Sequence, residues 1–309
     1  MWEFSVTKTD RLDRALRQAN GSQWMSRQAW DWLLQNGRVR VNGQRMLKGG
    51  TQVGEGSRIQ VEVPERLGLY PATVRAVPAW IAPDLSVGAF VKPAGVDSVA
   101  LFPWDHESFA SQICAFAEGE GICSPRDFAA LSPPPVLEGG LLQRLDRDTS
   151  GLLLSAFTSS RKALFRQLFS EKKVGKEYLA LTDSYLPALQ GEHRFWLDTG
   201  GGDKVKAFLD PGKKELEEIC LNIEILKHSS KGSLLKVTTK HGARHVVRAT
   251  LAALGAPLLG DRIYGGSDQV SFHQLHASRL FFPFDARELF VEAPPPQTFL
   301  DSIAQLGLK

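Results

Sequence analysis

Two aspartates, Asp146 and Asp148, lie in a short polar stretch between apolar runs, where a carboxylate could act as acid, base or nucleophile. The stretch reads RLDRDTSG over residues 144–151 and continues into three leucines. Thr-Ser-Gly favours a tight loop and the leucines favour a buried strand, so the loop would hold its side chains on a rigid support. These residues alone also allow a turn whose carboxylates only accept hydrogen bonds from nearby backbone amides.

A basic stretch around residue 248 could provide the counter-charge for such a carboxylate. Apolar residues at positions 247, 251 and 254 recur at helical spacing and predict a helix over residues 244–254. Arg244 and Arg248 would then lie four residues apart near the positive N-terminal end, which attracts a carboxylate or a phosphate. A solvated basic first turn is the alternative interpretation.

Tyr178 is a candidate stacking surface because it lies in the alternating run KEYLALT, residues 176–182. The alternation predicts a strand in which Tyr178 and Ala180 share one face. A strand tyrosine is more often a core or edge residue, and the run by itself favours that simpler interpretation.

The elements that must position these groups alternate between strand and helix. Strand-like runs cover residues 151–157, 177–181 and 234–239, and helical patterns cover residues 159–169 and 244–254. This alternation predicts an α+β domain over residues 84–309. Before it, four prolines without clear periodicity predict a linker over residues 64–83.

The first 63 residues form a separate basic segment. They hold ten Lys or Arg against six Asp or Glu, a balance that could attract phosphates irrespective of base sequence. Asp10 and Ser26 are expected to cap two short helices, and Gly37 to end the second. The following RVRVNG, residues 38–43, predicts a hairpin with both of its arginines pointing outward.

The loop with Asp146 resembles the RLDxxTSGLLL signature of RNA pseudouridine synthases of the Rlu type. The stretches VKPAG and KEYLA, at residues 91–95 and 176–180, resemble two further motifs, and the similarity covers most of residues 84–290. This resemblance implies a mixed, mainly antiparallel sheet and an enzyme that converts uridine in RNA to pseudouridine. It gives Asp146 as the essential carboxylate and Tyr178 as the residue that stacks on the target base.

Residues 241–265 and 275–280 are similar to the remaining family motifs, GRTHQIR, GHPILGDxxYG and LHAxxL. By this resemblance, Arg248 pairs with the catalytic aspartate and Leu280 helps to wall the uracil pocket. The further residues that we expect to contact the substrate are Arg144, Arg244 and His245.

The chain departs from the family pattern at four positions. Its residues there are Gln143, Ala243, Val246 and Ala256, in place of histidine, arginine, glutamine and histidine. None of these departures removes the aspartate, the tyrosine or the paired arginine, but those at 243 and 246 bear on RNA contacts and pocket geometry. Arg244 could supply the missing guanidinium from one position away.

The N-terminal segment resembles the small α/β RNA-binding domain named after ribosomal protein S four. The resemblance rests on RLD at residues 11–13, SR at 26–27 and GRVRVNG at 37–43. In that family the second helix and the hairpin present basic residues to RNA. The residues with an implied docking role are Arg27, Arg38 and Arg40.

Conversion of uridine to pseudouridine detaches uracil, turns it and rejoins it through carbon without redox change, so no cofactor is expected. The three cysteines form no CxxC pair, and the HxxH of His273 and His276 has no second ligand pair, so no metal site is assigned. Asp146 must stay charged in a partly dry pocket, which calls for a cation such as Arg248. Attack on the sugar and action as a base both need this charge, and the choice between them stays open.

Two rival functions are compatible with the sequence. A non-catalytic RNA-binding or ribosome-assembly factor could keep the fold, although the joint presence of Asp146, Tyr178 and Arg248 argues against it. A glycoside- or nucleotide-cleaving enzyme could use Asp146 with Asp148, but neighbours two apart on a tight loop are not an evident flanking pair.

The partner expected from the resemblance is RNA, with ribosomal RNA favoured and transfer RNA as the alternative. The apolar runs are too short for a secretion signal or a membrane span. We therefore expect a cytoplasmic protein without a membrane partner, and a monomer. The particular uridine is not encoded in any recognisable feature of the chain.

Overall fold

The computed structural model describes residues 1–19, 25–63, 69, 71–132, 137–200, 204–210, 212 and 216–308. The chain forms two compact units. The first combines Met1–Arg75 with Val99–Gly140, and the second combines Ala76–Ser98 with Leu141–Lys309. Residues 64–68 and 70 of the expected linker lie outside the described residues.

The beginning of the first unit is a small antiparallel sheet with the strand order β1-β6-β3-β4, on which two short helices pack. Fully buried Leu16, Leu33 and Val39 join the apolar stripes of both helices to the sheet. The elements are β1 (Trp2–Ser5), β2 (Asp10–Arg11), α1 (Leu12–Gln18), α2 (Arg27–Gln35), β3 (Val39–Val41), β4 (Gln44–Met46), β5 (Gln52–Val53) and β6 (Arg58–Val61).

Local chemistry explains most of these boundaries. Ser26 Oγ accepts from Ala29 N over 3.1 Å, which confirms the expected cap of α2. Asn42 and Gly43 have φ values of 49° and 82°, as a tight hairpin turn between β3 and β4 requires. The expected cap of α1 was wrong, because Asp10 pairs with Val53 in the short ladder of β2 and β5.

Residues 99–140 belong to this first unit, whereas the sequence placed them in the domain 84–309. They contain α3 (Phe109–Gly119) and α4 (Pro125–Ala130). Trp32 of α2 contacts Phe102 and Trp104 with ring centroids 5.7 and 5.1 Å apart, and Ser26 Oγ donates to Leu101 O. Contacts between residues so distant in sequence have no local signature, so the assignment could not be made from periodicity.

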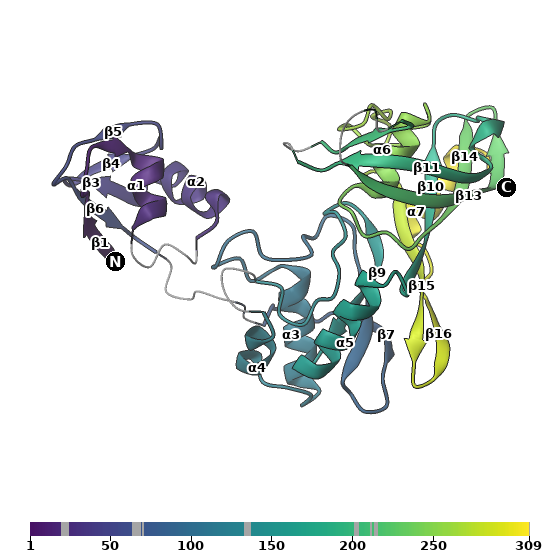
Figure 1. Cartoon of the computed structure of the whole chain (residues 1–309), viewed down its shortest axis with the longest axis horizontal. Coiled ribbons are helices and arrows are strands. Elements are labelled where there is room, and N and C mark those ends of the chain that lie inside the picture. Colours follow the sequence, from purple (N-terminus) through teal and green to yellow (C-terminus); the bar gives the residue numbers. More distant parts are fainter. Residues whose placement is uncertain are drawn as a thin grey trace. The chain divides into compact units, whose positions relative to one another are not determined.

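The second unit is built on one mixed, mainly antiparallel sheet with the order β12-β11-β13-β14-β10-β15-β9-β8-β7, and β16 pairs with β15 (Figure 1). Its elements are β7 (Val77–Ile81), β8 (Val87–Lys92), β9 (Ser150–Ala156), α5 (Ser159–Ser170), β10 (Gly175–Thr182), η2 (Pro187–Leu189), β11 (Gly191–Asp198), β12 (Lys206–Phe208), β13 (Glu217–Ser229), β14 (Gly232–Thr239), α6 (Val246–Ala253), β15 (Leu275–Phe284), β16 (Arg287–Glu292) and α7 (Gln297–Gln305).

Alternation along β10 divides the packing of this sheet between its two faces. Tyr178 and Ala180 contribute to a core cluster with the buried side of α6. Leu179 and Leu181 face the other way and pack with α7. Helices α6 and α7 therefore cover opposite faces of the same strand.

The predicted linker, residues 64–83, was too long, because residues 77–81 form strand β7 and pair with β8. The sequence concealed this strand because it contains Pro78 and its residues are mostly exposed. Proline is tolerated on a terminal strand, where a missing backbone donor need not face a neighbour. The sheet accordingly begins inside the stretch that we expected to be linker.

Candidate active site

The loop that carries Asp146 is held by residues that follow β8. Ser98 Oγ donates to Leu145 O over 2.6 Å and accepts from Leu145 N over 3.0 Å. Gly95 N donates to Arg147 O over 2.9 Å. These bonds fix the backbone on both sides of Asp146, so its carboxylate is presented from a rigid loop.

Lys92, at the end of β8, joins the same two segments from inside. Its Nζ donates to Pro93 O, Val96 O and Arg147 O at 2.9, 2.7 and 2.8 Å, and the residue is fully buried. Three carbonyls match the three donors of an ammonium group. Burial lowers the pKa of Lys92 to about 7, against the opposing charge of Asp97. The sequence reasoning missed this role, although the VKPAG stretch contained the signal for it.

Gly151 lets strand β9 approach β15 after the loop. Its φ is +115°, and a Cβ atom there would come within 2.2 Å of Ala277 O. The two strands are parallel at this point, with Ala277 opposite Gly151. Any side chain at this position would push the loop away from β15.

The two histidines of the HxxH stretch form hydrogen bonds with residues at the end of the loop that carries Asp146. His273 Nε2 lies 2.7 Å from Thr149 Oγ1, and His276 Nδ1 lies 2.9 Å from Ser150 Oγ. Burial, followed by the charge of Arg248, lowers the pKa of His273 to about 4. Both rings are thus neutral supports for the loop.

Arg248 lies between two carboxylates. Its Nη1 donates to Asp146 Oδ2 over 2.8 Å, and its Nε and Nη2 donate to the two carboxylate oxygens of Asp261 over 2.7 and 2.8 Å. The Asp261 side chain is fully buried and that of Arg248 is 5% exposed, whereas that of Asp146 is 22% exposed. Of this connected group, Asp146 is therefore the member that a substrate can reach.

Arg248 and Asp261 each favour the charged form of the other. Burial alone would lower the pKa of Arg248, but its hydrogen bonds to Asp261 and the charge of Asp146 raise it above its ordinary value. Burial would raise the pKa of Asp261, and Arg248 more than offsets this, so that pKa is lowered. The ring of Tyr264 lies 5.3 Å from the guanidinium and adds a cation–π contact. Arg248 thus stays charged beside Asp146.

His245 is the second group beside the carboxylate. Its Nε2 lies 3.6 Å from Asp146 Oδ1, and its Nδ1 lies 3.1 Å from the hydroxyl of Tyr264. The backbone of His245 is left-handed, with φ 56°, and α6 begins only at Val246. This corrects the predicted helix 244–254: exposed Arg244 precedes the helix and does not share a helical face with Arg248.

Tyr178 lies on β10, opposite Val237 and Ala277 of the adjacent strands, and is only 6% exposed. Burial, followed by the charge of Asp146, raises its pKa above the ordinary range, so the phenol keeps its proton. Leu145, beside Asp146, packs against the same cluster. Tyr178 and the loop are therefore brought together by one core.

Two further residues that we expected to contact the substrate, Arg144 and Leu280, lie outside the core cluster that contains Tyr178. Arg144 is exposed on the loop. Leu280 is buried with Phe282 and Val291 in a cluster that does not contain Tyr178. A register shift between Glu177 and Tyr178 separates the two parts of β10 that pair with β15. Leu280 lies opposite Lys176, two residues before Tyr178 on the same strand, and its expected place in the wall of the uracil pocket stays a prediction.

Three of the four departures from the family pattern are packed in the core that includes Tyr178. Val246 and Ala256 are buried there and Ala243 packs against it. The fourth, Gln143, donates from Nε2 to Leu152 O over 3.4 Å. These positions therefore serve packing and loop support in this chain.

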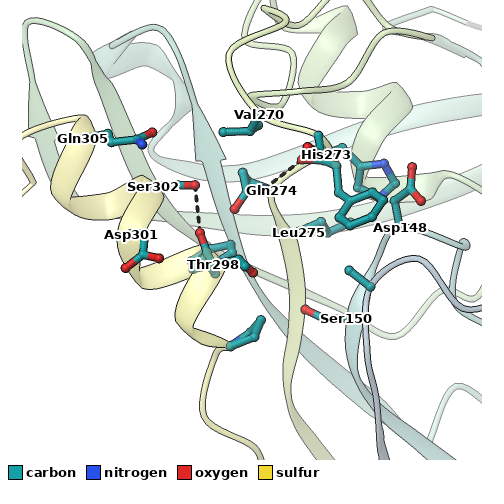
Figure 2. A pocket seen from close by; sticks show the side chains of 15 residues that line it. Asp148, Ser150, Val270, His273, Gln274, Leu275, Thr298, Asp301, Ser302 and Gln305 are labelled. Carbon is teal, nitrogen blue, oxygen red and sulfur yellow. Dashed lines mark hydrogen bonds between the residues drawn. The ribbon is translucent and has the colours of Figure 1, made fainter.

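Asp148 faces a different space from Asp146. It lines a cavity of about 290 Å³ together with residues of α7 and of the segment before β15. Figure 2 shows Thr298, Asp301 and Gln305 of α7 on one side of the cavity and Asp148 on the other. Burial raises the pKa of Asp148. The different surroundings of the two aspartates do not suggest a carboxylate pair flanking one bond.

The arginines expected to dock RNA are on the surface of the first unit. Arg27 is 85% exposed and lies 3.8 Å from Asp31. Arg38 lies 3.8 Å from Glu62 and over the ring of Trp32, and Arg40 donates to a backbone carbonyl of its own hairpin. Surface ion pairs of this kind are weak, so a phosphate could compete for these side chains.

Across the described ranges, no group of three or more His, Cys, Asp or Glu side chains is placed to hold a metal ion. In the same part of the chain, no helix combines the length and the apolar character needed to cross a membrane.

Comparison with known proteins agrees with this geometry. The family model for RNA pseudouridylate synthase matches residues 89–253, a range that contains Asp146, Tyr178 and Arg248. An uncharacterised RNA pseudouridine synthase of Mycoplasma pneumoniae is 27% identical over 312 residues, which cover 99% of this chain and 96% of the relative. The ribosomal large subunit pseudouridine synthase D of Borreliella burgdorferi is 32% identical over 131 residues, 42% of this chain and 39% of that protein.

The fold has a solved counterpart in the human protein RNA pseudouridylate synthase domain containing 4. Its structure matches with a TM-score of 0.59 and 18% identity, over 74% of this chain and 93% of that chain. At this identity the likeness supports the fold, and the expected mixed, mainly antiparallel sheet is confirmed.

Proposed function

Since the chain belongs to the RNA pseudouridylate synthase family, we propose that it isomerises uridines of ribosomal RNA, with Asp146 as the reacting carboxylate. Family membership makes it an isomerase that acts on RNA. The choice of ribosomal RNA and the roles of individual residues are our proposal. Partial matches to two relatives named ribosomal large subunit pseudouridine synthase D favour ribosomal over transfer RNA.

The observation that carries the proposal is the bridge from Asp146 through Arg248 to Asp261. It keeps a negative charge at a partly exposed position, where breaking the bond from uracil to ribose leaves positive charge on the sugar. A fixed carboxylate stabilises that charge without reorganisation, and it can form or relay a bond at the sugar. Asp261 fixes the guanidinium that would otherwise be free to move.

Tyr178 gives the detached base a surface on which to turn. The core holds its ring beside the loop with Asp146 and its phenol stays protonated, so it can stack on a base that enters there without exchanging protons with it. A target nucleotide must leave its helix to reach this position, as for other enzymes that act on a base. Single-stranded or loop uridines are accordingly the favoured targets.

We also propose that the N-terminal basic segment docks RNA through Arg27, Arg38 and Arg40. The exposure of Arg27 and Arg40 and the weak ion pairs of Arg27 and Arg38 support this role. Phosphate contacts of this type position a substrate and leave the choice of base to the active site. The family model does not extend to this segment, so its resemblance rests on its own motifs.

The test is to incubate the purified full chain with transcripts of ribosomal RNA and, separately, of transfer RNA. Pseudouridines are mapped by carbodiimide modification and primer extension, with Asp146→Asn as the matched control. New stops in ribosomal RNA that are absent with the variant are the expected result. Stops only in transfer RNA would contradict the substrate assignment, and equal stops with Asp146→Asn would contradict the role of Asp146.

A further inference from the structure

We propose that His245 Nε2 accepts the proton that leaves C5 of the target uracil after the new carbon–carbon bond has formed. The inference rests on the proposed isomerisation with Asp146 at the sugar. It assigns a catalytic proton acceptor to the second half of the reaction. The role depends on which ring nitrogen of His245 carries hydrogen.

The hydroxyl of Tyr264 fixes the position of that hydrogen. It donates its hydrogen to Val205 O over 3.0 Å and accepts from Val205 N over 2.9 Å. A phenol has one hydrogen to donate and two lone pairs, so the remaining lone pair can only accept from a donor. With the phenol hydrogen on Val205 O, His245 Nδ1, at 3.1 Å, is the nitrogen that carries hydrogen when the ring is neutral, and our proposal assigns this tautomer.

The other nitrogen of His245 is consequently a bare acceptor. Nε2 lies 3.6 Å from Asp146 Oδ1, and two acceptors facing each other in this way need a donor between them or beside them. Burial, ahead of the opposing charge of Asp146, lowers the pKa of His245, so the ring is neutral and able to take a proton at physiological pH. Arg248 and Arg244 act in the same direction as burial.

The reacting carbon must come close to this nitrogen. Asp146 acts at C1′ of the ribose in the proposed reaction, and in the product C5 of uracil is bonded to that same C1′. A base that lies beside Asp146 is therefore beside C5 when its proton has to leave. Tyr178 is the weaker acceptor, because burial, followed by the charge of Asp146, raises its pKa and favours the protonated phenol.

The step balances without any other reagent. Uracil leaves with the electron pair of the N1–C1′ bond, and the pair of its C5–C6 double bond then forms the C5–C1′ bond. This leaves hydrogen on C5 and a double bond between C6 and N1. Transfer of the C5 proton to Nε2 restores the C5–C6 double bond, and N1 takes up a proton from the imidazolium or from water. No electron or proton is gained or lost overall.

The left-handed backbone at position 245 decides which variants can be used. Asparagine and glycine tolerate φ 56°, whereas alanine would add strain. His245→Asn keeps a polar side chain without a basic nitrogen, and His245→Gly leaves space for added imidazole. His228→Asn removes an exposed histidine of β13 and is the matched control.

The experiment uses the full chain and ribosomal and transfer RNA transcripts made with uridine triphosphate or with its 5-deuterated form. Pseudouridine formation is followed in single turnovers at saturating enzyme. His245→Asn is expected to react roughly 10²-fold more slowly, the usual effect of removing a positioned base. Deuterium at C5 should slow this variant more than the wild type, because loss of the C5 proton becomes the slow step. Imidazole should accelerate His245→Gly but not the wild type.

Each contrary outcome has a distinct meaning. Slower turnover of His245→Asn without a larger deuterium effect would make His245 a support for Asp146 and overturn the inference. Wild-type rates in both His245 variants would overturn it as well. A wild-type chain that forms no pseudouridine in either RNA would refute the proposed function itself, and the inference would fall with it.

Discussion

Arg248 Nη1 donates to Asp146 Oδ2 over 2.8 Å, although the two residues are 102 positions apart in the chain. The bond connects the loop before β9 to the first turn of α6. Because Asp261 holds the other side of the guanidinium, Arg248 cannot follow Asp146 if the loop moves. The charge of the site and the position of the loop therefore depend on the same side chain.

Asp146→Asn is expected to fold and to bind RNA like the wild type, but to lose pseudouridine formation by about 10³-fold or more, as when other catalytic groups are removed. The amide keeps the shape of the side chain and loses the charge. Single-turnover assays together with filter-binding measurements separate the two effects. Turnover close to the wild-type rate would refute the role of this carboxylate.

Arg248→Ala is expected to lower the free energy of unfolding by about 3–5 kcal/mol, because buried Asp261 is left without its counter-charge. Arg248→Lys keeps the charge, but its amino group cannot contact both carboxylates in a fork. We therefore expect it to recover only part of the stability, and its turnover to be severely impaired. Urea denaturation and turnover are measured for both variants. An active and stable Arg248→Ala protein would show that the bridge is dispensable.

Sequence motifs predicted the parts of the site that are formed by residues close together in the sequence. The strand with Tyr178, the loop with Asp146 and the pairing of Arg248 were all placed by their motifs, because each lies within a run of characteristic spacing. Asp261 lies in one of the same motifs, but its hold on Arg248 was not predicted. Its role depends on a contact with α6 that exists only after folding.

Other features were out of reach because they arise from long-range packing. The left-handed φ of His245 shortens α6 at its start, and no pattern of apolar residues reports a single backbone angle. Trp32 and Trp104 meet across more than seventy positions, which placed residues 99–140 with the first unit. Periodicity shows which face of a helix or strand is buried, but not which other element packs against that face.

Lys92→Met is expected to destabilise the protein and to slow turnover at the same time. The substitution removes the donor from the carbonyls of Pro93 and Val96, at about 1–3 kcal/mol for each group left unsatisfied as an upper range, whereas Arg147 O keeps its bond from Gly95 N. The loop with Asp146 then loses its inner link. Thermal denaturation and kcat are compared with those of Lys48→Met, which alters an exposed lysine of the N-terminal segment. Equal stability of the two variants would contradict this role of Lys92.

His273 is expected to make stability depend on pH below neutrality. Its pKa is about 4 in the folded chain, against about 6.5 when unfolded, so the unfolded state binds more protons between these values. The free energy of unfolding should therefore fall as the pH decreases from about 6.5 to 4, by up to about 3 kcal/mol from this group. Denaturation at a series of pH values should show a smaller fall for His273→Gln. An identical pH profile would mean that burial and the charge of Arg248 do not hold the ring neutral.

The salt dependence of RNA binding should reveal whether the N-terminal segment contacts phosphates. Deletion of residues 1–63 would expose Phe102 and Trp104, which pack on Trp32, so charge removal is the cleaner test. Arg27→Gln combined with Arg40→Gln removes two exposed charges and leaves the aromatic contacts in place.

If both arginines contact phosphates, the variant should bind RNA more weakly at low salt, and the plot of log K against log salt should be shallower by about one unit per lost contact. Turnover at saturating RNA should be unchanged, because phosphate contacts position the substrate and do not enter the chemical step. Arg287→Gln, an exposed arginine of β16, is the matched control and should leave the slope as it is. An unaltered slope in the double variant would mean that the N-terminal segment does not dock RNA through these side chains.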